Sequence, residues 1–115
     1  MLRREEKPSG MPHNAIAVGT TIKGSITAEE DYRIDGTVEG DIQCSGKIVV
    51  GPQSVITGNI TCSQADIFGT VNGNVTLSDN LIIRASGKIT GDITTRTLTV
   101  EPNAIFSGKC IMHKG

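Results

Sequence analysis

Two histidines and a scattered set of carboxylates are the side chains of this chain that could carry out acid–base chemistry. His13 and His113 are the only groups whose ordinary pKa lies near neutrality, and they stand near opposite ends of the 115 residues. Neither has partners at a spacing that would suggest a catalytic triad. Paired carboxylates could form where Glu39 or Asp41 approaches Asp35. The sequence favours a solvated rim for these acids and predicts no catalytic residue.

No group of residues has the spacing of a metal or phosphate site. Calcium loops need a dense run of acidic residues, whereas the acids here are spread along the chain. The three cysteines have no metal-type spacing and fit a reducing compartment, so Cys44 and Cys62 are expected to be free thiols in the core. No glycine-rich loop leads into a helical pattern, as a nucleotide cradle would require. We expect neither a metal nor a cofactor.

Charge and hydropathy argue against two broad classes of protein. The formal net charge is −1 at pH 7, whereas nucleic-acid-binding proteins are usually strongly basic. No stretch approaches the length of about 18 apolar residues that a membrane-spanning helix needs. Residues 1–6 lack the apolar run of a signal peptide. We therefore expect a cytoplasmic protein without a nucleic-acid partner.

A short motif of the form apolar-x-Gly-x-apolar recurs six times between Ile22 and Cys110. Its central glycines are Gly24, Gly40, Gly58, Gly73, Gly91 and Gly108, which gives steps of 16, 18, 15, 18 and 17 residues. No helical periodicity interrupts them. Six copies at a nearly fixed period are typical of a solenoid built from strands.

Aliphatic residues occupy fixed positions around each glycine. Two positions before it stand Ile22, Val38, Ile56, Val71, Ile89 and Phe106, and two positions after it stand Ile26, Ile42, Ile60, Val75, Ile93 and Cys110. Turn residues such as Gly51-Pro52 absorb the differences in spacing and leave these columns in register. Stiff β-branched side chains suit such stacked strands.

The sequence therefore predicts an all-β, single-domain parallel β-helix (a β-solenoid) of about six rungs. We assign residues 1–15 to a flexible N-terminal tail, because this segment is rich in proline and glycine and has little to bury. Residues 16–112 form the β-helix, and residues 113–115 are a short C-terminal tail.

The two ends of this β-helix are candidate assembly surfaces. A solenoid exposes unpaired backbone groups at its first and last rungs, and monomeric solenoids usually cover them with polar caps. No amphipathic helix pattern precedes Ile16, and the last rung is unusually apolar, with Ile105, Phe106, Cys110, Ile111 and Met112. We predict an assembly interface that contains Phe106, Cys110 and Met112 at one end and Ile22 and Ile26 at the other.

Several stretches together resemble the bactofilin family of bacterial polymer-forming cytoskeletal proteins. They are Tyr32-Arg33-Ile34-Asp35-Gly36-Thr37-Val38-Glu39-Gly40, Val49-Val50-Gly51-Pro52, Gly58-Asn59-Ile60, Gly91-Asp92-Ile93, Val100-Glu101-Pro102-Asn103-Ala104 and Phe106-Ser107-Gly108. The resemblance covers about residues 16–112. Any single Gly-x-Ile would mean little, but the combination is specific.

This resemblance implies a right-handed, three-sided β-helix that assembles end to end into filaments without nucleotide. In such filaments like ends meet, so the polymer is non-polar. The family often lies on the inner membrane through a short N-terminal motif and scaffolds cell-shape and cell-wall enzymes. In this chain Leu2, Arg3 and Arg4 are a loose version of such a motif and are the candidate membrane contact. The implied partners are other copies of the chain, inner-membrane lipid and cell-wall enzymes, at the cytoplasmic face of the inner membrane.

Two alternatives from other functional classes stay open. A β-helix enzyme could be an acyltransferase, which needs a strict six-residue period and usually a catalytic histidine, or a polysaccharide-acting enzyme, which needs longer rungs with site-building loops. The steps of 15 to 18 residues with short corners favour neither. The other alternative is a monomeric binding module, for which sizing experiments would show a monomer at every concentration.

Overall fold

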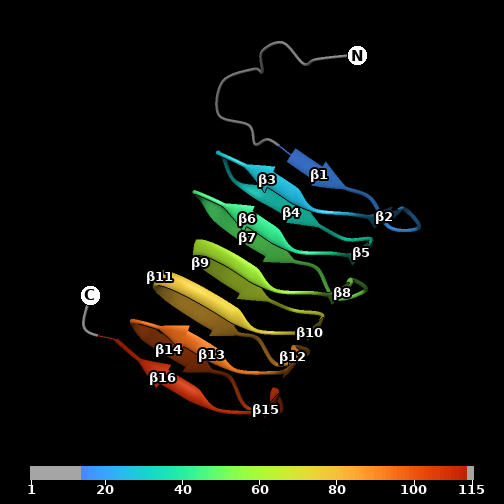
Figure 1. Ribbon diagram of the computed structural model, residues 1–115. Coiled ribbons are helices and arrows are strands. Elements are labelled where there is room, and N and C mark those ends of the chain that lie inside the picture. The colour runs from blue at the N-terminus through green and yellow to red at the C-terminus, as the bar shows by residue number, and fades with distance from the viewer. Residues whose placement is uncertain (1–13, 114–115) are drawn as a thin grey trace.

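The described part of the chain, residues 14–113 of the computed structural model, is a rod of stacked strands without a helix (Figure 1). All strand pairings are parallel, and each strand pairs with the strand that lies one turn further along the chain. The rod has three faces, with six stacked strand segments on each. The predicted all-β coil of about six turns is therefore confirmed, whereas its right-handed sense stays a prediction.

The first face is a sheet in the order β2–β5–β8–β10–β12–β15. It consists of β2 (Thr21–Lys23), β5 (Thr37–Glu39), β8 (Val55–Thr57), β10 (Thr70–Asn72), β12 (Lys88–Thr90) and β15 (Ile105–Ser107).

The second and third faces share two long strands, β9 (Ile60–Ile67) and β11 (Val75–Ile83), which pass from one face to the other. The second face also contains β3 (Ile26–Ala28), β6 (Ile42–Cys44), β13 (Ile93–Thr95) and β16 (Cys110–Met112). The third face also contains β1 (Asn14–Ile16), β4 (Tyr32–Ile34), β7 (Lys47–Val50) and β14 (Thr97–Val100).

Three kinds of corner join the faces. The glycine corner joins the first face to the second and holds the six motif glycines. The strand corner joins the second face to the third, where β9 and β11 continue through it. The variable corner joins the third face to the first and absorbs the differences in repeat length, for example at Glu101-Pro102-Asn103-Ala104 between β14 and β15.

Strand β1 begins at Asn14, whereas we expected the tail to continue to residue 15. The reason is pairing, because Asn14, Ala15 and Ile16 align with Tyr32, Arg33 and Ile34 of β4. Residues 1–13 lie outside the described part. At the other end β16 finishes at Met112.

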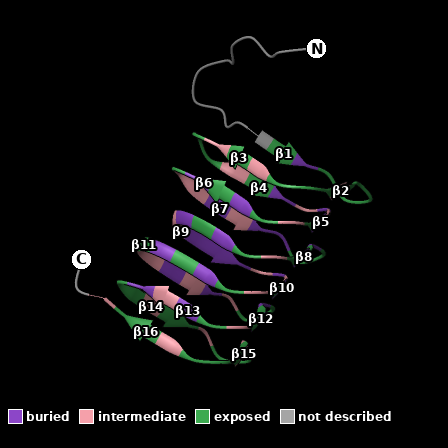
Figure 2. Ribbon diagram, viewed as in Figure 1, coloured by how far each residue is buried: buried purple, intermediate pink, exposed green. Residues whose placement is uncertain are grey.

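Stacked aliphatic side chains fill the interior of the rod. Along each strand every second residue points inward, so that Val38, Ile56, Val71 and Ile89 of the first face are fully buried. Figure 2 shows this buried interior in the middle turns, whereas β14, β15 and β16 contain only intermediate and exposed residues. The core is thus one continuous column that becomes exposed where the coil stops.

Candidate assembly surfaces

Both ends of the rod are open sheet edges. Strands β14, β15 and β16 each pair with one strand only, as do β1, β2 and β3 at the other end. Within residues 14–113 the outer side of each terminal strand therefore keeps backbone N–H and C=O groups without a strand partner, which is the usual template for adding a further strand.

The C-terminal end exposes a cluster of large apolar side chains. Met112 is 52% exposed, Val100 46%, Ile105 51% and Ile111 57%, whereas Ile89, one turn before Phe106, is fully buried. Phe106, Cys110 and Leu98 are partly buried against the core. We call the inward residues of this end the C-terminal end surface: Leu98, Val100, Phe106, Cys110 and Met112. Ile105 and Ile111 alternate with them and point outward at its rim, in register with Lys88 and Thr94.

The structure thus brings Phe106, Cys110 and Met112 together on one end of the rod. Phe106 lies in β15, and the other two lie in β16 on the neighbouring face. Ile22 in β2 and Ile26 in β3 lie at the opposite end, where both are partly buried against the core. Their participation in an assembly interface stays a prediction.

Leu98 and Val100 belong to the same end, although they were not among the predicted interface residues. They lie in β14, which pairs only with β11 among the described strands. The last turn therefore starts with β14 on the third face, before the final glycine motif. The signal was present in the sequence, since the inward pair Leu81 and Ile83 is followed by Leu98 and Val100 and by no further pair.

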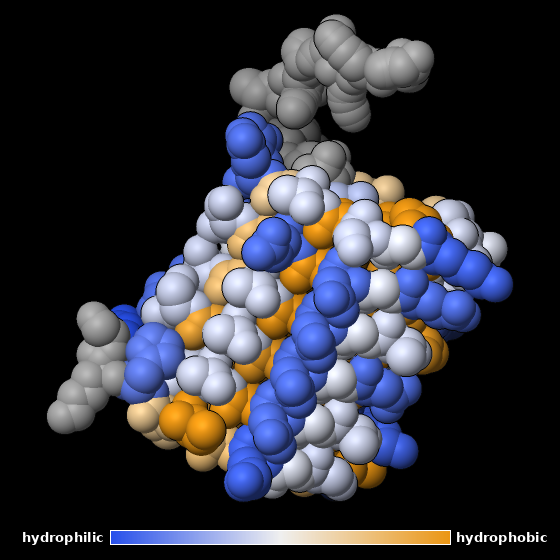
Figure 3. Space-filling view, viewed as in Figure 1, coloured by the Kyte–Doolittle hydropathy of each residue, from blue (hydrophilic) through white to orange (hydrophobic). Residues whose placement is uncertain are grey.

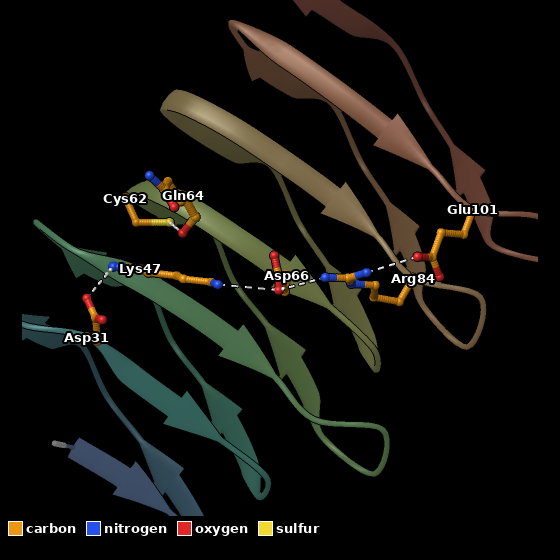
Figure 4. A network of polar contacts seen from close by, with 7 residues as sticks. All are labelled: Asp31, Lys47, Cys62, Gln64, Asp66, Arg84 and Glu101. Carbon is orange, nitrogen blue, oxygen red and sulfur yellow. Dashed lines mark hydrogen bonds and ion pairs between the residues drawn. The ribbon is translucent and has the colours of Figure 1, made fainter. Parts of the chain in front are cut away.

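A row of alternating charges crosses the third face toward the same end (Figure 4). Lys47 Nζ lies 3.5 Å from the Asp66 carboxylate, which also accepts a hydrogen bond of 3.1 Å from Arg84 Nη2. Arg84 Nη1 donates a bond of 2.9 Å to Glu101 Oε2. Asp66 is only 9% exposed, so its charge needs these cations. The row stabilises four successive turns and ends at Glu101 in the last turn.

A second polar row follows the glycine corner. Asp41, Asn59, Asn74 and Asp92 each stand directly after a motif glycine, and their Oδ1 atoms accept bonds of 3.0 to 3.2 Å from the backbone N–H one turn further on. The last donor is the N–H of Lys109. Figure 3 shows a continuous hydrophilic stripe along the rod, as such stacked polar columns require. The row has a direction, with side-chain acceptors facing the C-terminal end.

A comparison with models of protein families identifies the family of this chain. The model of the family described as "Bactofilin: Polymer-forming cytoskeletal" matches residues 14–111. This chain belongs to the bactofilin family. It is therefore a structural protein of a polymer-forming cytoskeletal family, in agreement with the resemblance of its motifs. A comparison with curated protein sequences gives no match.

A solved structure supports the same assignment. The bactofilin is similar to the protein in a cryo-EM reconstruction of Thermus thermophilus bactofilin double helical filaments, with a TM-score of 0.82 and 26% sequence identity. The match covers 88% of this chain and 100% of the other. The likeness to a protein solved as a filament supports self-assembly of this chain.

The described residues considered for catalysis make separate contacts in this bactofilin. His113 Nε2 lies 3.0 Å from the carbonyl oxygen of Leu77, and His13 lies outside the described residues. Asp35 pairs with Arg33 at 2.9 Å, whereas Asp41 accepts a bond from the backbone of Asn59. Between residues 14 and 113 no three His, Cys, Asp or Glu side chains form a group that could hold a metal ion.

The two stacked thiols of the bactofilin are free and act as donors at the strand corner. Cys44 Sγ donates to the carbonyl oxygen of Glu30, and Cys62 Sγ donates to that of Gln64, both at 3.2 Å. Burial raises the pKa of Cys62 to about 12, and it also raises the pKa of Cys44. Both groups are therefore neutral thiols at physiological pH and poor nucleophiles.

The predicted membrane contact of the bactofilin cannot be placed. Leu2, Arg3 and Arg4 lie outside the described residues, so this contact stays a prediction. Within residues 14–113 the structure has no helix of the length and apolar character needed to span a membrane.

Proposed function

We propose that this bactofilin forms non-polar, nucleotide-independent filaments in which like ends of the β-helix meet. The observation that carries this proposal is the C-terminal end surface, where the inward side chains of Val100 and Met112 are about half exposed and those of Leu98, Phe106 and Cys110 are only partly buried beside an open sheet edge. Contact with a second copy removes these side chains from water and also covers the unpaired edges. A monomer gains neither.

The polar row at the glycine corner favours like ends over head-to-tail stacking. In the four turns that hold Asp41, Asn59, Asn74 and Asp92, a side-chain oxygen accepts the N–H that lies one turn further on. At the last turn the equivalent position is Lys109, which has donors only. A head-to-tail joint would place the N–H of Ser25 against Lys109, a donor against a donor. The row thus ends at Lys109 and does not continue into a second copy stacked in the same direction.

The proposal extends to the arrangement of the filaments and their cellular role. The related Thermus protein forms double helical filaments, and we assign the same two-stranded arrangement to this chain. As the family resemblance implies, the filaments scaffold cell-shape or cell-wall enzymes at the cytoplasmic face of the inner membrane, with Leu2, Arg3 and Arg4 as the lipid contact.

The substitution Phe106→Arg tests the end-to-end contact. Phe106 lies over Ile89 in the terminal strand of the first face, and no turn of the described chain covers its outer side. In a like-end contact the substitution places two cations in one desolvated interface, which is strongly unfavourable. We expect a folded monomer or dimer with a β-rich circular dichroism spectrum and no filaments by electron microscopy.

A matched control is Thr76→Arg, which adds the same side chain at an exposed position in the middle of the second face. This variant should keep its filaments. Normal filaments of Phe106→Arg would show that the C-terminal end is not an assembly surface, and an unfolded protein would assign Phe106 to the core alone.

A further inference from the structure

We propose that two C-terminal ends meet about a two-fold axis through the middle of the first face, so that Lys109 of each copy binds Glu101 of the other. This inference rests on the like-end contact proposed above and specifies its rotational register. It also assigns to two charged residues, which lie outside the apolar cluster, the role of selecting how a second copy docks.

The charges of the last turn lie at its corners. Lys109 stands at the glycine corner between β15 and β16, and Glu101 stands at the variable corner between β14 and β15. Arg96 precedes β14 at the strand corner, where it binds Asp79 at 3.0 Å. His113 lies one turn beyond it at the same corner, with its backbone N–H donating to the carbonyl oxygen of Thr95. Among the residues that the structure describes, no carboxylate lies within ion-pair distance of the Lys109 ammonium. Lys109 is exposed at the end of the rod.

A three-sided end can pair with its own copy in three ways. For the two rods to continue in line, the two-fold axis must pass through one corner and the middle of the opposite face. The axis then exchanges the other two corners between the copies, while the first corner meets its own equivalent. This is the general property of an isologous contact, in which residue i meets j of the partner and j meets i.

Charge distinguishes these three arrangements. An axis through the middle of the first face exchanges the glycine and variable corners, so Lys109 meets Glu101 twice. An axis through the middle of the second face brings Lys109 toward Arg96 and Glu101 toward its own copy. An axis through the middle of the third face brings the two copies of Lys109 together. The first arrangement brings Arg96 toward its own copy, whereas the third pairs Arg96 with Glu101 at both exchanged corners. Arg96 is already neutralised by Asp79, but Lys109 has no described carboxylate within ion-pair distance. The first arrangement is therefore the one in which the unpaired Lys109 meets only an opposite charge.

The charge row on the third face supplies the second argument. Lys47, Asp66, Arg84 and Glu101 alternate in sign along the rod, and Glu101 is the open end of the row. Its Oε2 accepts a bond from Arg84 and its Oε1 accepts one of 3.0 Å from the backbone N–H of Ala85. The carboxylate is thus fixed in place and still has free lone pairs. The next member of an alternating row is a cation, and Lys109 of the second copy supplies it.

The same axis also places apolar residues at the centre of the contact. It passes through the middle of the first face, where Phe106 is the central residue of β15. The two Phe106 rings then meet near the centre of their shared side, with the charged pairs at either end of it. Apolar anchors surrounded by polar pairs at the rim are the usual anatomy of a protein interface.

Two opposite charge reversals test the proposal. Lys109→Glu places Glu against Glu101 in both exchanged positions, and Glu101→Lys places Lys against Lys109. Each variant alone should assemble poorly. When the two variants are mixed, both exchanged corners hold opposite charges again, and filaments should return. The readout is the protein left in the supernatant after filaments are pelleted, together with electron microscopy of the pellet.

The expected effect is a severalfold change. Converting two rim attractions into two repulsions weakens the C-terminal contact by about tenfold or more. Since each subunit is held by one C-terminal and one N-terminal contact, the supernatant concentration rises by about the square root of that factor, roughly threefold or more. High salt should reduce the defect, because these pairs lie at the rim. Lys88→Glu, an exposed reversal one turn away from the end, is the matched control and should assemble normally.

Other outcomes overturn the proposal. Stronger assembly of Lys109→Glu alone indicates the axis through the second face, and unchanged assembly indicates the axis through the third face or no role for Lys109. Two weakened variants that fail to recover on mixing exclude the exchange of these corners. Glu101→Lys also loses the ion pair with Arg84 and could misfold for that reason. In that case the assembly of Lys109→Glu alone tests the proposal. If any of these results is found while Phe106→Arg still abolishes filaments, the proposed like-end contact is retained. Only the proposed rotational register of that contact is then rejected.

Discussion

The α-carbon of Gly73 lies so close to the carbonyl oxygen of Gly58, one turn earlier, that a β-carbon on Gly73 would overlap it. Gly73 also has a φ of +153°, a conformation that residues with a side chain rarely adopt. Gly73→Ala should therefore be strongly destabilising, by more than about 4 kcal/mol, because the overlap is with backbone that stacking holds in place. Thermal unfolding followed by circular dichroism measures this.

Gly24→Ala is the control that separates strain from overlap. Gly24 has a similar φ of +131°, but nothing lies within 4 Å of a β-carbon placed there, because it belongs to the first turn. Its substitution should cost only the conformational strain, about 1–3 kcal/mol. Equal losses for the two variants would show that φ alone explains the glycine column.

The glycine repeat made the fold predictable from the sequence. Its period gave the number of turns, and the columns beside it, such as Ile56 and Ile89, are fully buried as the alternation requires. The terminal position of Phe106, Cys110 and Met112 could be predicted from the repeat, whereas their role in an assembly interface stays a prediction. Val100 was not, because the limits of the last turn depend on which strands lack a partner.

The charge row could not be predicted from the sequence. Lys47, Asp66 and Arg84 are separated by unequal steps and occupy outward positions that look like ordinary solvated residues. Their contacts depend on the register across corners of different length, and only the folded stack fixes it. The same applies to the relation between Lys109 and Glu101, which lie at different corners of one turn.

The polar row at the glycine corner should contribute measurably to stability. Asp92→Ala removes the acceptor of the Lys109 N–H, whereas Asp92→Asn keeps an oxygen at the same place. We expect a loss of about 0.5–1.5 kcal/mol for alanine and a much smaller one for asparagine. Urea unfolding compares the two variants. Equal losses would indicate that the carboxylate charge, and not the acceptor, stabilises this corner.

Assembly should not require nucleotide or a metal ion. The described residues contain no cluster that could bind a metal, and the sequence contains no phosphate loop. Neither a chelator nor added nucleotide should change the thermal midpoint or the amount of pelleted filament. A clear shift with either reagent would contradict nucleotide and metal independence and would call for a search for the site.

Lipid binding, if it resides in the predicted N-terminal contact, should depend on residues 1–13 alone. Deleting them removes Leu2, Arg3 and Arg4 and leaves every described strand intact. The truncated chain should still form filaments but should no longer float with vesicles that contain anionic lipid. Equal flotation of both proteins would place the membrane contact on the β-helix.

Alkaline pH should destabilise the fold through Cys62. Its pKa is raised to about 12 by burial, whereas an exposed thiol in the unfolded chain ionises near 8.5. Below about pH 8 the thiol is protonated in both states, so its contribution is fully present. Between about pH 9 and 12 only the unfolded chain releases the proton, so the free energy of unfolding falls by about 1.4 kcal/mol for each pH unit.

Cys62→Val should remove this part of the alkaline slope, because valine fills a similar volume and cannot ionise. Burial also raises the pKa of Tyr32 and that of Cys44. The free energy of unfolding of Cys62→Val therefore still falls with pH because of these two groups, but less steeply than that of the wild-type chain. Denaturation under reducing conditions at pH 8 and pH 10.5 isolates the difference between the two proteins. A slope that is unchanged by Cys62→Val would mean that Cys62 ionises in the folded state, and that the strand corner is more accessible to water than its 5% exposure indicates.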